Sequence, residues 1–255
     1  MAAQATGRTA AGRAISRAAW ALAAFGIAVH ALHVGIGLFG PGVDVLIDDW
    51  VYIALIGLAA TLAVAAGLRR PEQRTACACL GAAIGVWFCG ELVWQVAGQP
   101  ASPAPSDWLM LAYYPLAFAG LVLLVHPHLR IAPRLLWLDG AIAITASTAA
   151  GAAILLPWTV NETGGSIGLV AVNLAFPVAD VLLIGFLAAA FAILGAARAP
   201  RHLLVMAAAL AVAAIADGTY LIQAARGTYL DGTLLDTLWP LAMLTQAASL
   251  WLVPA

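Results

Sequence analysis

Three carboxylic acids lie inside apolar stretches of the sequence that are long enough to cross a bilayer: Glu91, Asp180 and Asp217. A charged side chain at the centre of a membrane-spanning helix costs about 2.5–3.5 kcal/mol on insertion scales, so an acid kept there marks a functional site by default. A structural hydrogen bond between neighbouring helices is the alternative, and the residue types do not separate the two. We predict that these acids bind a small ligand, a cation or a proton.

Two histidines lie near the end of the first apolar stretch. His30 and His33 are three residues apart, so they share one face of a helix. That spacing suits ligation of a metal or haem, or pairing with Glu91. No cysteine and no Glu-x-x-His repeat completes a ligand set. The sequence therefore names the two histidines as binding candidates but leaves the metal and the cofactor unassigned.

Aromatic residues and prolines occur in the same parts of the chain. The aromatic residues that we predict to line a binding pocket are Trp94, Tyr114, Tyr220 and Trp239. The prolines are Pro115, Pro177 and Pro240. Each proline removes a backbone hydrogen bond, and membranes tolerate such breaks where neighbours or water satisfy the freed carbonyl. The pattern indicates a cavity, with an aromatic belt at the membrane interface as the alternative.

Motifs that carry catalysis in soluble enzymes are absent from the sequence. It contains no phosphate-binding glycine loop, no Gly-x-Ser-x-Gly turn and no His-Glu-x-x-His helix. The three cysteines, Cys77, Cys79 and Cys89, lie near or within one apolar stretch and define neither a disulfide framework nor a zinc site. We therefore predict no catalytic residue.

The composition is that of an all-α, polytopic membrane protein. Hydrophobic residues make up 64% and charged residues 9% of the 255 residues, whereas a soluble domain carries about 25% charged residues. A helical crossing needs about 20 apolar residues, and short breaks separate about eight such stretches. The expected helices are 16–39, 50–68, 75–97, 107–125, 134–156, 167–194, 202–225 and 235–252. The lipid bilayer is thus an expected partner, and nucleic acid is not.

The basic residues, all arginines, indicate how these helices are oriented. They precede the first helix and fall in every second connection, at Arg8, Arg13, Arg17, Arg69, Arg70, Arg74, Arg130, Arg134, Arg198 and Arg201. Short arginine-rich loops stay in the cytoplasm, so both termini are expected there, and only Arg226 falls in an outward loop. An all-arginine composition also favours a bacterial chain, and hence the bacterial plasma membrane.

Most acidic residues fall on the outward side of this topology. The outward loops contain Asp44, Asp48, Asp49, Asp107, Glu162, Asp231 and Asp236. Asp107 and Asp236 precede apolar stretches, where a carboxylate caps free backbone N–H groups, and capping alone explains them. The three intramembrane acids and the two histidines lie in the outer half of the bilayer, far from the arginines. The predicted binding site therefore faces outward.

The second, third and fourth expected helices resemble the sixth, seventh and eighth at an offset of about 126 residues. IALIGLAATLAVAAGLRR from Ile53 matches VLLIGFLAAAFAILGAAR from Val181, and YPLA from Tyr114 matches WPLA from Trp239. Glu91 falls opposite Asp217. Four helices separate the copies, so they enter the membrane in the same direction and form a parallel repeat. The expected division is a cytoplasmic tail at 1–15 and four-helix repeats at 16–125 and 126–255.

Several stretches resemble a known class of membrane region. They are PSDWLMLAYYPLAFAGLVLLV from Pro105, WLDGAIA from Trp137, NLAFPVADVLLIGF from Asn173 and ADGTYLIQAARGTYLDGTLLDTLWPLA from Ala216. Together they are similar to the membrane region that precedes GGDEF and EAL domains in cyclic di-GMP signalling proteins of actinobacteria. The resemblance implies a sensory input module whose helix packing controls a cytoplasmic cyclase or phosphodiesterase. Neither catalytic motif occurs in the chain, so we expect that activity only from domains outside it.

Three functions are consistent with these residues. The leading hypothesis is a membrane sensor that binds a small ligand, a cation or a proton in the outer half of its helix bundle. A transporter of small solutes or ions is the first alternative, because intramembrane acids, helix-breaking prolines and a repeat suit it. An intramembrane enzyme that uses carboxylates or histidines as acid and base is the second. A second copy of the chain is a candidate partner.

Overall fold

The computed structural model describes residues 2–129, 167–195 and 199–253, with five single positions between 129 and 167. All its long elements are helices: α1 Ala2–Ile36, α2 Tyr52–Arg69, α3 Arg74–Val96, α4 Pro105–Leu111, α5 Tyr113–Leu129, α7 Ile167–Leu194, α8 Arg201–Ala225 and α9 Leu238–Trp251. Two 3₁₀ turns, Pro41–Val43 and Pro71–Gln73, precede other helices. A π-helical segment, Val45–Val51, leads directly into α2.

Six helical stretches in the described residues are long and apolar enough to cross a membrane. They are Ala14–Ile36, Val45–Arg69, Pro71–Val96, Pro105–Leu129, Gly168–Leu194 and Arg201–Ala225. The helical, multi-pass class predicted from the sequence agrees with this finding. The helix expected at 134–156 lies outside the described residues. The helix expected at 235–252 is present as α9 but has only 14 residues.

Prolines explain the two clearest departures from the expected helices. Pro115 has no N–H for the carbonyl of Leu111, and α4 ends at Leu111. The helix expected at 107–125 is therefore two helices. Pro240 likewise leaves the carbonyl of Asp236 without its helical donor, and α9 starts only at Leu238. At 1.5 Å per residue α9 is about 21 Å long, shorter than the hydrocarbon core of about 30 Å.

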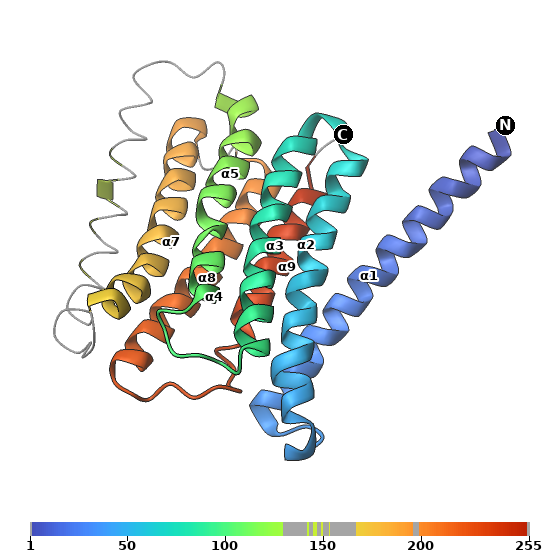
Figure 1. Cartoon of the computed structure of the whole chain (residues 1–255). Helices are drawn as coiled ribbons and strands as arrows, with labels where there is room; N and C mark the ends of the chain where they lie inside the picture. Colours follow the sequence, from blue (N-terminus) through green and yellow to red (C-terminus); the bar gives the residue numbers. More distant parts are fainter. Residues whose placement is uncertain are drawn as a thin grey trace.

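Six helices of the described residues pack in a closed ring. In order around the ring they are α2, α3, α5, α7, α8 and α9, and α9 packs back against α2. α1 lies outside the ring, where it contacts α2, α9 and the π-helical segment. Figure 1 shows the N-terminal part of α1 projecting away from the other helices, and both chain ends on the side of the α2–α3 connection.

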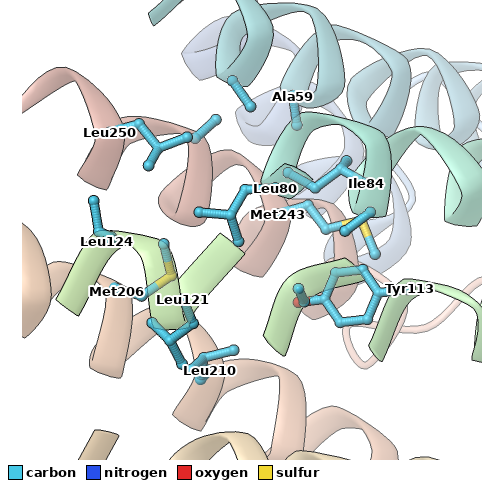
Figure 2. Packing of buried hydrophobic residues seen from close by; sticks show 14 of the residues in the cluster. Ala59, Leu80, Ile84, Tyr113, Leu121, Leu124, Met206, Leu210, Met243 and Leu250 are labelled. Atoms are coloured by element: carbon cyan, nitrogen blue, oxygen red, sulfur yellow. The ribbon is translucent and has the colours of Figure 1, made fainter. Parts of the chain in front are cut away.

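The interior of the ring is mainly apolar at the end near the arginines of the α2–α3 connection. Leu80 and Ile84 of α3, Leu121 and Leu124 of α5, and Met206 of α8 are each 2% exposed or less. Figure 2 shows these side chains packed against Met243 and Leu250 of α9. The polar residues that the sequence singled out lie in the opposite half of the helices. The ring therefore has a closed apolar half and a polar half.

Glycines allow the helices of this half to approach closely. A Cβ added to Gly81 of α3 would lie 2.5 Å from Cγ2 of Val64 in α2 and 3.2 Å from the Val64 backbone nitrogen. The Val64 side chain is 46% exposed and can rotate away, but its backbone nitrogen and the Ala60 carbonyl oxygen, 3.4 Å from the added Cβ, are fixed in α2. Gly85, one turn further along α3, would meet nothing within 4 Å. The two positions thus form a matched pair.

We expect Gly81→Ala to lower the free energy of unfolding by about 1–3 kcal/mol, the usual cost of an overpacked core. Gly85→Ala should leave stability unchanged or raise it by up to about 1 kcal/mol, because alanine is the better helix former. Unfolding of both purified variants in detergent micelles measures the difference. Equal stability of the two would contradict the close approach of α2 and α3.

Candidate functional site

A pocket of about 450 Å³ opens at the polar end of the ring. The start of α2, the end of α3 and the connection between α8 and α9 all contribute to it, and these segments lie together at the lower end in Figure 1. Its lining is aromatic, acidic and amide-bearing, and none of the described lining residues is Lys, Arg or His. The pocket therefore presents carboxyl groups and aromatic side chains to whatever enters it.

Glu91 lies on α3 in the wall of the pocket and is 9% exposed. The Tyr52 hydroxyl and the Trp87 indole N–H both donate to Oε1 of Glu91, each at 3.0 Å. Trp87 precedes Glu91 by one helical turn, so α3 itself places this donor. Because both bonds end on Oε1, we infer that Oε2 is the oxygen that meets a ligand.

Asp217 lies on α8 and joins three other elements. The Trp239 indole N–H of α9 donates to Oδ1 at 2.6 Å, and the Tyr114 hydroxyl of α5 donates to Oδ2 at 3.0 Å. Asp180 of α7, which is 2% exposed, lies close to Asp217. Asp217 thus holds together one side of the pocket.

The structure brings most of the predicted site residues together. Glu91, Trp94, Asp217, Tyr220 and Trp239 line the pocket directly. Tyr114 and Asp180 are not in the lining, but both contact Asp217. The acids therefore form one group with the aromatic residues.

Neither His30 nor His33 pairs with Glu91. His30 Nδ1 hydrogen-bonds the Thr237 hydroxyl at 2.9 Å. The ring of Tyr52 packs against His30 with centroids 6.0 Å apart, while its hydroxyl bonds Glu91, so Tyr52 separates the two. His33 bonds the Leu38 backbone carbonyl and Asp44. The alternative that paired a histidine with Glu91 is wrong.

Acidic residues at the pocket entrance are the main feature that sequence reasoning missed. Those in the lining are Asp44, Asp48, Asp49, Asp107, Asp231 and Asp236. The sequence assigned them to separate outward loops and did not connect them with a site. Six aspartates in three loops, on the side of the membrane that has few arginines, could have indicated a shared entrance that attracts cations. We call these six residues the acidic mouth.

Two residues of the acidic mouth form hydrogen bonds with the backbone of the turn in which they lie. The Asp107 carboxylate accepts the Ala104 backbone N–H at 2.7 Å, as its predicted capping role requires. Asp236 accepts the Thr233 backbone N–H at 2.7 Å and the Tyr229 hydroxyl at 2.8 Å. Burial raises the pKa of the Asp236 carboxyl above its ordinary value, although both of these bonds favour the ionised form. Capping therefore accounts for Asp107 and partly for Asp236.

Comparison with protein-family models, with curated proteins and with solved structures found no match to the chain. The function is therefore argued from the pocket itself. Carboxylates and aromatic faces together recognise positive charge.

Proposed function

We propose that the chain is a membrane sensory module that binds a small organic cation in the pocket. The observation that carries this proposal is the lining: Glu91 and Asp217 lie among Trp87, Trp94 and Trp239, with no basic residue in the described wall. An ammonium group gains from the face of an aromatic ring by about 0.5–2 kcal/mol, and more tryptophan faces add to this. A carboxylate adjacent to the rings supplies the compensating charge.

The proposed orientation places the pocket on the outer face of the bacterial plasma membrane. Arg69, Arg70, Arg74 and Arg201 lie at the helix ends opposite the pocket. Arginine-rich connections stay in the cytoplasm. Both termini are then cytoplasmic, and the acidic mouth draws cations from outside.

The proposed architecture is a parallel repeat with about eight helices, one of them in residues 134–156. The ring supports the repeat, because each contact in one half has a counterpart in the other. α2 on α3 corresponds to α7 on α8, α3 on α5 to α8 on α9, and α5 on α7 to α9 on α2. The neighbouring residues correspond too: Tyr52 lies beside Glu91 in one half, and Asp180 lies beside Asp217 in the other. One binding site would then lie between two related halves.

α9 offers a route from the pocket to the cytoplasmic side. At its start, Trp239 contacts Asp217; at its end, the Trp251 indole N–H donates to the Leu62 carbonyl of α2 at 3.0 Å. Arg69 stacks over the Trp251 ring at 4.7 Å. A ligand that changes the Trp239 contact would shift the equilibrium between two packings of α9. The resemblance to cyclic di-GMP signalling proteins supports an output of this kind.

Transport and catalysis are less well supported. The apolar half of the ring is filled by large, fully buried side chains such as Leu80, Leu121 and Met206. A solute could reach the other side only after this half repacked. No nucleophile with an adjacent base lies among the described pocket residues, so an intramembrane enzyme would depend on carboxylates alone as acid and base.

The test uses choline and its neutral carbon isostere, 3,3-dimethylbutan-1-ol, with the purified full chain. Both have the same shape, so the positive charge is the difference. We expect choline to change the tryptophan fluorescence saturably, and the neutral isostere to bind more than about tenfold more weakly. Equal responses to the two compounds, or no saturable response to choline, would overturn the proposal.

A further inference from the structure

A histidine and two carboxylates meet beside the pocket, outside the hydrogen-bond network of Glu91 and Asp217. His33 lies in the last turn of α1, Asp44 follows the Pro41–Val43 turn, and Asp48 lies on the π-helical segment. Nε2 of His33 is 3.2 Å from Oδ1 of Asp44 and 3.6 Å from Oδ1 of Asp48. One ligand atom from each residue lies within 4.8 Å of the other two.

These spacings suit one small metal ion. A tetrahedral zinc ion binds nitrogen and oxygen ligands at about 2.0–2.2 Å, which places neighbouring ligand atoms about 3.3–3.6 Å apart. The two measured distances from Nε2 agree with that separation. Three protein ligands leave one position for water or another group.

The orientation of His33 is a second, independent observation. Its Nδ1 is bonded to the backbone carbonyl of Leu38, so Nδ1 carries the proton. In the neutral ring Nε2 is then an acceptor that faces two more acceptors. This is unfavourable unless a cation, either a proton on Nε2 or a metal, lies between them. Metal-binding histidines are held in the same way through their other nitrogen.

Asp48 is incompletely satisfied in the same place. Its Oδ1 is buried and accepts no hydrogen bond from the described residues. Its Oδ2 packs under Gly232, where an added Cβ would lie only 2.8 Å away. His33 itself has a side chain that is 4% exposed. Oδ1 of Asp48 and Nε2 of His33 therefore face each other, and a cation between them would satisfy both.

We propose that His33, Asp44 and Asp48 bind a divalent transition-metal ion of the zinc class. An imidazole nitrogen favours zinc, copper, iron or nickel over calcium and magnesium, which prefer oxygen ligands. The ion would tie the end of α1 to the segment that starts α2, and would lie at the edge of the acidic mouth. The proposal does not rest on organic-cation binding, because metal binding is measured directly.

The test is calorimetric titration of Zn²⁺ into the full chain, purified in detergent and stripped of metal with a chelator. We expect one saturable equivalent. His33→Gln and Asp48→Asn should each weaken it by more than about tenfold, since loss of even an outer partner of a ligand costs 10–100-fold. His126→Gln, at an exposed position near the end of α5, removes a histidine elsewhere and should change nothing.

Other outcomes decide the proposal as well. Absence of saturable binding would show that His33 is only an ion-pair partner, and would overturn it. So would equal zinc affinity in the wild type, His33→Gln and Asp48→Asn. If His33→Gln does not fold, Asp44→Asn decides, because the Asp44 side chain is 50% exposed. Co²⁺ should give a d–d absorption band that the ligand variants lose, and Mg²⁺ should not compete.

Discussion

Replacement of Asp217 by leucine is expected to lower the free energy of unfolding by about 2–4 kcal/mol. Leucine has the same branching at Cγ but accepts no hydrogen bond. It would leave the Trp239 N–H and the Tyr114 hydroxyl without their shared partner. An orphaned buried group costs about 1–3 kcal/mol in soluble proteins, and interhelical bonds in membranes average about 0.6 kcal/mol. Two orphaned donors therefore give a loss in the stated range.

Asp217→Asn is the matched control for this prediction. Asparagine keeps one carbonyl oxygen for the Trp239 N–H, and its amide can donate to Asp180 or to the Tyr114 oxygen. It should lose less than about 1 kcal/mol. The measurement is reversible unfolding of the three proteins in mixed micelles. A leucine variant as stable as the asparagine variant would mean that Asp217 does not hold α5, α7 and α9 together.

The sequence predicted the acids and the aromatic residues because the cost of burying polar groups in lipid is large and general. An acid in an apolar helix must have a reason to be there, and Glu91 and Asp217 are found in one pocket. The hydrogen-bond donors were harder to foresee. The indoles of Trp87 and Trp239 donate to these acids, but the sequence did not indicate this, because an aromatic belt explains tryptophan equally well.

The acidic mouth depends on turns that hydrophobic periodicity does not reveal. Gly37 and Phe39 have φ of 69° and 78°, in the left-handed region. These residues fold the chain back after α1, so that Asp44 returns to His33. A one-dimensional pattern contains no information on such a reversal. The helix ends shifted for similarly local reasons, since α1 stops at Ile36, just before Gly37, and not at residue 39.

Glu91→Gln is expected to weaken choline binding by roughly 30- to 150-fold with little change in stability. Glutamine keeps a carbonyl oxygen that can accept from both Tyr52 and Trp87, as Oε1 does now. It removes only the negative charge. Two opposite unit charges about 5.5–8 Å apart attract each other by about 2–3 kcal/mol at an effective dielectric constant of about 20, which converts to that loss of affinity.

Glu72→Gln provides the control for charge alone. Glu72 is exposed in the turn before α3, at the arginine end of the ring, so its loss changes the net charge equally but does not touch the pocket. Its variant should bind choline as the wild type does in a fluorescence titration. If the Glu91 and Glu72 variants bind choline equally well, the long-range field of the acidic mouth binds the cation. If only Glu91→Gln loses affinity, the ammonium group lies against the Glu91 carboxylate. We expect the selective loss in Glu91→Gln. Tyr52 and Trp87 both donate to Oε1 of Glu91, and this leaves Oε2 available to a cation in the pocket.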